Sequence, residues 1–540
     1  MDNGIAPNAK RLLWAGFMAI FAAGIGLAIR GGLFAEWLRT FNFTALQVGL
    51  INGAGFTGFC FGIIIGGIIV DKVGYGKLVI VAFVFHIISA FVTFGASAGM
   101  ATQTAFVYLW TGTFIFAVAN GTLEAVANPL VATLFPNNRM HYLNILHASW
   151  PAGLVFGGLV STSLPNLSWK VKLAVFLVPT AIYGIMFMGQ HFPKSEASRK
   201  GLSLGEMFKD VGIMGSLVIG FFVGFFVKDG LGPLLQGFTG NDFFGANSQT
   251  WKYISIGVGV LVWLGFSGLS GWSMGAVLLF ILFITHALVG AVELGTDSWI
   301  QNITGNILTP QQGQWLFIFT SALMLSLRFC GHWIEKNLKL SPVGLLFVCS
   351  LCAVAGLNMV SAIATFGGAM AALVIYGIGK TFFWPTMLAV TSDRFPRTGA
   401  VAMSIMGGLG MMSAGLVGSP GLGYAKDRFA GNELQTADSA VYAEYKAATP
   451  SQWLFFGEVH GIDSAKLGTA LTSTNRTPAE TLVVKANERG DRRTLKADSV
   501  IPMVMAVIYL GIILYFKARG GYKAVHIVET EPAREPAKVV

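Results

Sequence analysis

The sequence contains little charge. Only 11% of its 540 residues are Asp, Glu, Lys or Arg, whereas soluble globular chains carry about 25%. So small a share cannot cover the surface of a soluble protein. Disordered, collagen-like and coiled-coil chains are excluded because each needs a polar or repetitive composition. No metal-ligand set supports an enzyme, so we expect neither an enzyme nor a cofactor.

Cysteine is scarce as well. The four cysteines are Cys60, Cys330, Cys349 and Cys352, and all lie in apolar segments, which predicts no disulfide framework. Cys349 and Cys352 form a C-x-x-C motif without a partnering His or Asp. This context favours two packed core thiols over a metal or redox pair.

Apolar residues and glycine are abundant. Hydrophobic residues make up 54% of the chain, and 68 residues are glycine. This combination predicts a multi-pass membrane protein whose helices pack closely through small residues. Two stripes with four-residue spacing mark such contacts, namely Gly58-Gly62-Gly66 and Gly410-Ala414-Gly418.

Fourteen segments are apolar and long enough to cross a bilayer, which takes about 20 residues. They are 12–34, 46–70, 77–97, 104–134, 143–164, 171–191, 211–228, 252–269, 273–299, 314–334, 342–363, 367–392, 399–424 and 499–517. The segments 211–228 and 252–269 are short, so twelve spans plus an interfacial or re-entrant pair is the competing count.

Lys and Arg concentrate in alternate loops. With a cytoplasmic N-terminus, the inner loops hold Lys10, Arg11, Lys72, Lys77, Arg139, Lys194, Arg199, Lys200, Lys209, Lys336, Lys339, Arg394, Arg397, Lys517, Arg519 and Lys523. The short outer loops hold Arg39, Lys170, Lys172, Lys228 and Lys252. This bias predicts a multi-pass protein of the plasma membrane with both termini inside. The polar segment 426–498 then lies outside, where Thr477-Pro478-Ala479-Glu480 predicts a capped helix ending near Gly490.

The loop after the second span reads Gly67-Ile-Ile-Val-Asp71-Lys72-Val-Gly74-Tyr-Gly76-Lys77. It resembles the G-x-x-x-D-[RK]-x-G-x-[RK]-[RK] loop of the major facilitator superfamily of transporters. Two glycines allow a sharp turn, the aspartate can cap or pair with a helix end, and the lysines anchor the loop inside. The expected gating residues are Gly67, Asp71, Lys72, Gly74, Lys77 and, from the second half, Arg328.

Further motifs resemble the fucose/galactose/glucose:proton symporters of that superfamily. They include Thr44 to Leu50, Glu124-Ala-Val-Ala-Asn128-Pro129, Leu134-Phe-Pro136, Asn144, Gly153, Glu293 with Trp299, Arg328 to Gly331, Ser341-Pro342 and Phe383-Trp384-Pro385-Thr386. The match covers roughly residues 40–160 and 285–395 and fails at 205–270 and 426–498. An acid of the family's first span is also missing, and the nearest ionisable residue is Arg30.

The resemblance implies an all-α integral membrane protein with a major facilitator fold of two six-helix halves, and the span count predicts two extra helices between them. The expected parts are an N-terminal half (1–192), an inner loop with two inserted helices (193–271) and five helices of the C-terminal half (272–425). An extracytoplasmic polar segment (426–498), the last helix (499–520) and a cytoplasmic tail (521–540) follow.

Ionisable residues within the spans are functional candidates, because a charge at mid-depth costs several kcal/mol unless it is paired or hydrated. Asn120, Glu124 and Asn128 are four residues apart, which predicts one polar helix face toward a central cavity, beside the helix-breaking Pro129. The resemblance implies that Glu124 matches a fourth-span acid that contacts substrate and couples protons. The alternative is a structural Glu paired with a neighbouring helix.

The second half carries a similar set. His286, Glu293 and Asp297 share one helix face, and the two acids would repel each other if both were ionised, so one is expected to hold a proton. Lys380 lies mid-span and needs a counter-charge, which Glu293 or Glu124 would supply. A hydrated Asp297 and a purely structural Lys380 stay open as alternatives.

Aromatic and polar residues complete the predicted site. Flat tryptophan faces beside Asn, His, Glu and Lys suit a sugar, and they would also suit a nucleoside or a sugar acid. The proton-coupling candidates are Glu124, Glu293 and Asp297. The substrate-binding candidates are Arg30, Asn52, Asn120, Asn128, His147, Trp150, His286, Trp299, Lys380 and Trp384.

These features predict a secondary active transporter that works by alternating access. Proton-coupled symport of a small hydrophilic solute, with a monosaccharide favoured, is the leading hypothesis. The alternatives are an exchanger or exporter of organic anions or sugar acids, for which Arg30 and Lys380 would supply cations, and a nucleoside transporter. A receptor that uses 426–498 as its ligand domain is a remote alternative. The expected partners are the solute, protons and the lipid bilayer, and no nucleic acid.

Overall fold

Helices follow one another along the chain. The computed structural model describes residues 7–41, 45–164, 166–194, 201–245, 248–331, 333, 337, 340–448, 450–451, 453–454 and 456–525. Within these ranges, thirteen helices are long and apolar enough to cross a membrane. The protein is therefore an all-α, multi-pass membrane protein, as its composition predicts. The predicted loop residues Arg199, Lys200, Lys336 and Lys339, together with Thr44 and the tail from 526 on, lie outside the described residues.

The first half contains the six expected spans. They are α1 (Ala9–Phe41), α2 (Ala45–Val73), α3 (Tyr75–Gly95), α4 (Thr102–Leu134), α5 (Arg139–Ser163) and the pair α6 (Trp169–Ala174) and α7 (Leu177–Phe187). A Cβ on Gly58 would lie 2.5 Å from the Phe114 carbonyl oxygen, and one on Gly62 2.2 Å from that of Val118. Glycine therefore lets α2 pack directly on α4, as the first small-residue stripe predicts.

The second half is built from longer, interrupted helices. One span joins α13 (Val277–Gly290), the π-helical turn η3 (Ala291–Gly295) and α14 (Thr296–Ile307). The next helices are α15 (Pro310–Phe329), α17 (Pro342–Ser361), α18 (Phe366–Thr381) and α19 (Phe383–Arg394). The last are α20 (Val401–Ser413), the π-helical turn η5 (Ala414–Gly418), α21 (Ser419–Ala437), α24 (Pro478–Asp498) and α25 (Val500–Ala518). Helix α15 occupies the expected span 314–334 but is not among the thirteen apolar candidates.

The second small-residue stripe also marks a close contact. A Cβ on Gly418 would lie 2.7 Å from the Cα and the carbonyl oxygen of Ala291, and one on Gly290 would lie 2.0 Å from the Gly410 carbonyl oxygen. Glycine at these points therefore brings the span that contains η3 against the span that contains η5. Both interruptions lie at this contact, and π-helical turns are frequent at functional sites.

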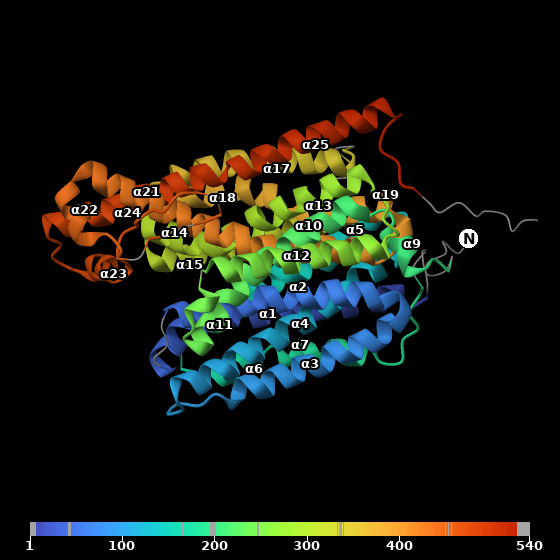
Figure 1. The fold of residues 1–540 in the computed structure, drawn as a ribbon, viewed down its shortest axis with the longest axis horizontal. Helices are drawn as coiled ribbons and strands as arrows, with labels where there is room; N and C mark the ends of the chain where they lie inside the picture. Colours follow the sequence, from blue (N-terminus) through green and yellow to red (C-terminus); the bar gives the residue numbers. More distant parts are fainter. Residues whose placement is uncertain are drawn as a thin grey trace, which may run out of the picture.

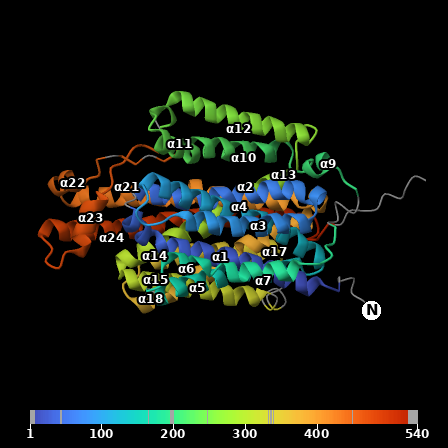
Figure 2. The same cartoon turned by 90° about the horizontal axis from the view of Figure 1, so that it is seen from below.

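The inserted pair lies beside the bundle. Helix α10 (Gly212–Phe225) continues through η1 (Phe226–Leu231) into α11 (Gly232–Thr239), and α12 (Gln249–Leu269) returns along it. Figure 2 shows α10 and α12 together on one side, with α12 outermost. A short helix, α9 (Leu204–Phe208), precedes them. Residues 212–231 and 249–269 each meet the length and hydropathy of a span, which favours two crossings over a re-entrant pair.

The polar segment forms a cap, here called the polar cap, by which we mean residues 426–498. It contains the end of α21, α22 (Ser439–Tyr445), α23 (Ser464–Thr472) and α24, and it projects from the end of the molecule opposite the N-terminus (Figure 1). Thr477 and Glu480 form the predicted capping box. The helix continues to Asp498, however, and the expected end near Gly490 is wrong. Gly490 serves packing instead, because a Cβ there would lie 2.6 Å from the Ala430 nitrogen.

Candidate functional site

A cavity of about 380 Å³ lies between the two halves, toward the polar cap. This volume is within the range of small-molecule sites. The first half lines it with α1, α2 and α5, and the second half with η3, α14 and α15. The residues that line it are Leu27, Ala28, Gly31, Gly32, Asn52, Phe56, Trp150, Leu154, Gly158, Ser161, Thr162, Leu294, Asp297, Ser298, Gln301, Gln314, Phe317 and Ile318. The predicted site residues Asn52, Trp150 and Asp297 therefore meet at this cavity.

A second cavity of about 20 Å³ lies deeper, with room for about one water molecule. Its lining consists of Glu124, His147, Trp150, Glu293, Leu294, Arg328, Trp384 and Met411. Trp150 and Leu294 line both cavities and therefore separate them. The larger cavity suits a solute and the smaller one suits a proton or a water molecule.

Glu124 of α4 lies at the start of a polar chain. Asn128 Nδ2 donates to Glu124 Oε2 at 3.1 Å, and His147 Nε2 donates to Asn128 Oδ1 at 2.8 Å. These three predicted residues are thus linked across α4 and α5. Asn120 does not join them, because its Oδ1 accepts from His86 Nε2 at 2.7 Å inside the first half. Eight residues turn an α-helix about 80° beyond two full turns, so Asn120 and Asn128 face different neighbours.

Arg328 is the centre of the site and not part of a gating loop, where the sequence had placed it. Its Nη2 donates to Glu293 Oε1 at 3.1 Å, its Nε to the Thr381 carbonyl at 3.0 Å, and its Nη1 to the His147 carbonyl. Only 2% of its surface is exposed. The guanidinium therefore ties α15 to η3 and α18 of its own half and to α5 of the other. An arginine inside an otherwise apolar span was the sequence signal for this role.

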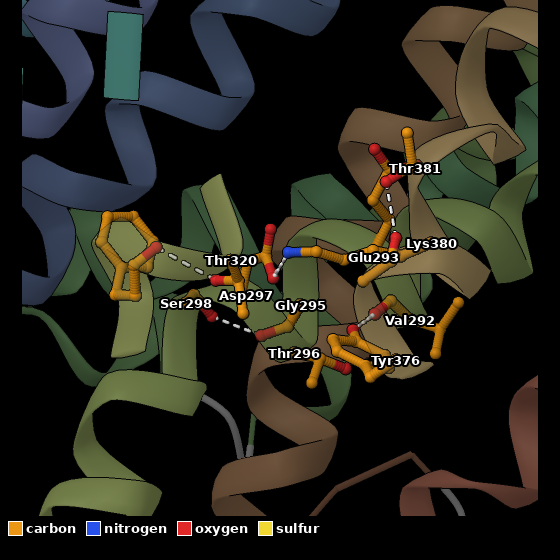
Figure 3. A network of polar contacts seen from close by, with 12 residues as sticks. Val292, Glu293, Gly295, Thr296, Asp297, Ser298, Thr320, Tyr376, Lys380 and Thr381 are labelled. Carbon is orange, nitrogen blue, oxygen red and sulfur yellow. Dashed lines mark hydrogen bonds and ion pairs between the residues drawn. The ribbon is translucent and has the colours of Figure 1, made fainter. Parts of the chain in front are cut away.

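Lys380 of α18 pairs with Asp297 of α14, and neither Glu293 nor Glu124 is its partner. Figure 3 shows the lysine reaching this carboxylate, with Tyr376 and Thr296 beside it. Glu293 and Asp297 thus each pair with a separate cation. The physical reason is that Arg328 of α15 already pairs with Glu293, which leaves Asp297, four residues further along the span, as the partner of Lys380.

Arg30 lies outside the cavity. Its guanidinium carbon is 3.9 Å from the centre of the Phe116 ring, and its Nη1 donates to the Gly26 carbonyl at 3.1 Å. Four other α1 residues line the cavity, namely Leu27, Ala28, Gly31 and Gly32, and Arg30 is not among its lining residues. The expectation that Arg30 reaches the substrate is therefore not met in this conformation, and its cation is buried inside the first half.

The remaining aromatic candidates divide into two groups. Trp384 lines the small cavity, and the ring of the fully buried His286 lies 4.6 Å from its own. Trp299 instead turns toward α21, where its Nε1 donates to the Ser419 carbonyl at 3.0 Å. The structure thus brings Trp384 and His286 to the site and leaves Trp299 outside the cavity lining.

The end of the bundle that carries both described chain ends, here called the termini end, is closed. Arg139 Nη1 of α5 lies 3.2 Å from Asp393 Oδ1 of α19, and the Tyr522 hydroxyl donates to Asp393 Oδ2 at 2.9 Å. We call these contacts among Arg139, Asp393 and Tyr522 the latch. Close packing closes the same end, because a Cβ on Gly67 of α2 would lie 2.1 Å from Ser404 Cβ of α20. The sequence had included Gly67 in the gating loop but had missed the Arg139–Asp393 pair.

The rest of the gating loop is a tight turn between α2 and α3. Gly74 has a φ of 92°, which favours glycine. Gly76 lies within α3, so only one of the two glycines is needed for the turn. Lys72 and Lys77 are exposed at this end, and Asp71 is in the last turn of α2.

Comparisons with known proteins agree with this architecture. The profile of the Major Facilitator Superfamily matches residues 16–419. The L-fucose-proton symporter of Escherichia coli is 30% identical over 145 residues, which are 26% of this chain and 32% of that protein. The cis,cis-muconate transport protein of Acinetobacter baylyi is 23% identical over 173 residues, 32% of this chain and 40% of that protein. The chain thus matches less than half the length of either relative.

A solved structure resembles most of the chain. The proton:xylose symporter XylE, bound to 6-bromo-6-deoxy-D-glucose, superposes with a TM-score of 0.57 over 93% of this chain and 95% of its own, at 10% identity. At this identity the likeness shows the fold alone.

Within the described ranges, no group of three or more His, Cys, Asp or Glu is placed to hold a metal ion.

Proposed function

The chain belongs to the major facilitator superfamily and is a membrane transporter, and from this premise we propose that it carries out proton-coupled symport of a small neutral solute, with a monosaccharide favoured. The cavity of about 380 Å³ binds the solute, and Glu124 carries the proton. Asn128 and His147 orient Glu124, and Trp150 separates the proton site from the solute.

One observation carries the preference for a neutral solute, namely that each cation of the site already has a carboxylate. Arg328 pairs with Glu293, and Lys380 pairs with Asp297. Arg30, the third cation that would have favoured an anionic solute, faces the interior of the first half. The cavity therefore offers uncharged hydrogen-bonding groups, such as Asn52, and an aromatic wall, which suit hydroxyl groups on a ring.

Glu124 is suited to carry a proton because it differs from the other two acids. Among the described residues it makes no ion pair, and its polar partner is the Asn128 amide. A buried carboxylate without a cation is costly when charged, whereas its protonated form is neutral. Proton loading and release at Glu124 therefore change the charge of the site by one unit, while the two ion pairs stay intact.

A second candidate function is exchange of organic acids. Asp297 lines the cavity and its side chain is 14% exposed, so a solute carboxylate could replace it at Lys380. The similarity to a muconate transport protein supports this alternative. Such a solute would need Lys380, whereas a neutral sugar would not need its charge.

Transport by Glu124→Gln in proteoliposomes separates these functions. The variant keeps the hydrogen-bonding shape but cannot release a proton, so it should retain solute exchange and lose accumulation driven by a pH gradient. Wild-type protein is first tested by counterflow against sugars, sugar acids and nucleosides. Accumulation by the variant under a proton gradient would remove Glu124 as the carrier, and a wild type that exchanges only acids would favour the second function.

A further inference from the structure

A groove on the outside of the bundle lies apart from the transport site. It has a volume of about 460 Å³ and runs between the termini-end halves of α13 and α25. Aliphatic residues of both helices line it, among them Ile281, Ile284, Ile508 and Ile512. None of its lining residues belongs to either cavity between the halves. A groove of this kind faces the acyl chains of a bilayer.

Gly511 keeps the groove open. It lies inside α25, where glycine is less favourable than alanine, and a Cβ there would meet nothing within 4 Å. Glycines that bring helices together in this protein behave differently, since a Cβ on Gly62 would collide with backbone. Helix packing therefore does not account for Gly511, and the missing side chain leaves space for an outside group.

The mouth of the groove is electropositive. Tyr515 lines it, and the Arg519 guanidinium carbon lies 4.8 Å from the Tyr515 ring centre. Helix α13 begins at Val277 on the other wall, and no side chain caps its first N–H groups, which adds partial positive charge. Asp210 is the acid beside α13, where its backbone carbonyl accepts a hydrogen bond from the Ala276 backbone nitrogen. Burial raises the pKa of its carboxyl, while Arg397 lowers it.

The loop before α13 places this mouth at a membrane surface. Trp272 is 59% exposed and Met274 is 64% exposed, although both are apolar. Exposed tryptophan next to an apolar helix end is typical of the interface between lipid headgroups and acyl chains. The groove therefore starts at headgroup level and extends into the hydrocarbon layer.

We propose that this groove binds one anionic phospholipid of the leaflet at the termini end. An acyl chain lies over Gly511 between α13 and α25, and the headgroup phosphate contacts Arg519 and the start of α13. Apolar burial supplies the affinity for the chain, and the positive mouth selects an anionic over a zwitterionic headgroup. Because α13 continues into η3, which carries Glu293, the lipid packs against a helix of the transport site.

Native mass spectrometry of the purified protein with phosphatidylglycerol and phosphatidylcholine tests this site. The wild type should retain one phosphatidylglycerol in preference to phosphatidylcholine. Gly511→Leu fills the groove and should lower that occupancy about tenfold, whereas Gly257→Leu, also with nothing within 4 Å of its Cβ but on α12, should not. Arg519→Gln should reduce the preference for phosphatidylglycerol about fivefold, the contribution of one basic residue near a lipid surface, and Lys10→Gln should leave it unchanged.

The outcomes are decisive in both directions. Equal loss in Gly511→Leu and Gly257→Leu, or unchanged binding in Gly511→Leu, would overturn the site. Unchanged headgroup preference in Arg519→Gln would overturn the anionic ligand. A wild-type dimer that excludes phosphatidylglycerol would show that a second copy of the chain covers the groove, and would equally refute the proposal.

Discussion

Replacing Asp393 by Asn should open the termini end of the protein. Asp393 joins the two halves through Arg139, and both side chains are largely buried, with exposed fractions of 15% and 7%. A hydrogen bond to a charged group contributes about 1.5–3 kcal/mol and a neutral one about 0.5–1.5 kcal/mol. Asn keeps the shape but not the charge, so the closed state should lose about 1–1.5 kcal/mol. This loss shifts the equilibrium about 5- to 12-fold toward the open state.

Distances between two spin labels measure this equilibrium directly. Lys10 on α1 and Arg397 next to α19 are exposed at the termini end of the two halves, and each can be replaced by a labelled cysteine after the four native cysteines are removed. In Asp393→Asn the ratio of the longer-distance to the shorter-distance population should rise about 5- to 12-fold. Arg139→Gln should act in the same direction.

A double-mutant cycle decides whether the pair is responsible. If Arg139 and Asp393 stabilise the closed state through each other, the double variant should shift the population by less than the sum of the two single shifts. Additive shifts, or an unchanged distance distribution in Asp393→Asn, would refute the assignment of this pair as the latch.

Three further predictions follow from contacts elsewhere in the bundle. Arg328→Gln leaves Glu293 buried without its cation and should lower the free energy of unfolding by about 3–5 kcal/mol, measured by thermal unfolding. Adding Glu293→Gln should recover part of this loss, and no recovery would contradict the pairing. Gly62→Ala should lower the unfolding midpoint because its Cβ would lie 2.2 Å from a carbonyl oxygen, whereas Gly53→Ala, with nothing within 4 Å, is the neutral control. Deleting the chain from Tyr522 onward should shift the spin-label distances as Asp393→Asn does, since the Tyr522 hydroxyl bonds Asp393; unchanged distances would remove the tail from the latch.

Local patterns in the sequence sufficed for the membrane class, the helices and the family. Apolar length sets the spans, because a helix must cross the hydrocarbon layer with every backbone group satisfied internally. Four-residue spacing predicted the glycine contact of α2 with α4 and the Asn128–Glu124 hydrogen bond. A capping box is equally local, so the start of α24 at Thr477 was predictable, whereas its end depended on packing against Ala430.

Only the tertiary structure decided which charges meet. The Arg139–Asp393 pair joins residues 254 positions apart, and Arg328–Glu293 and Lys380–Asp297 join different helices of one half. Helical periodicity gives the face of a residue on its own helix but not the neighbour that the face meets. A π-helical turn such as η3 also changes the angle between successive side chains, so the α-helical periodicity does not continue unchanged from Glu293 to Asp297. Arg30 and Gly31 are neighbours in α1, yet Arg30 faces the interior of the first half and Gly31 lines the cavity. The packing of α1 against α4 determines which side each residue faces.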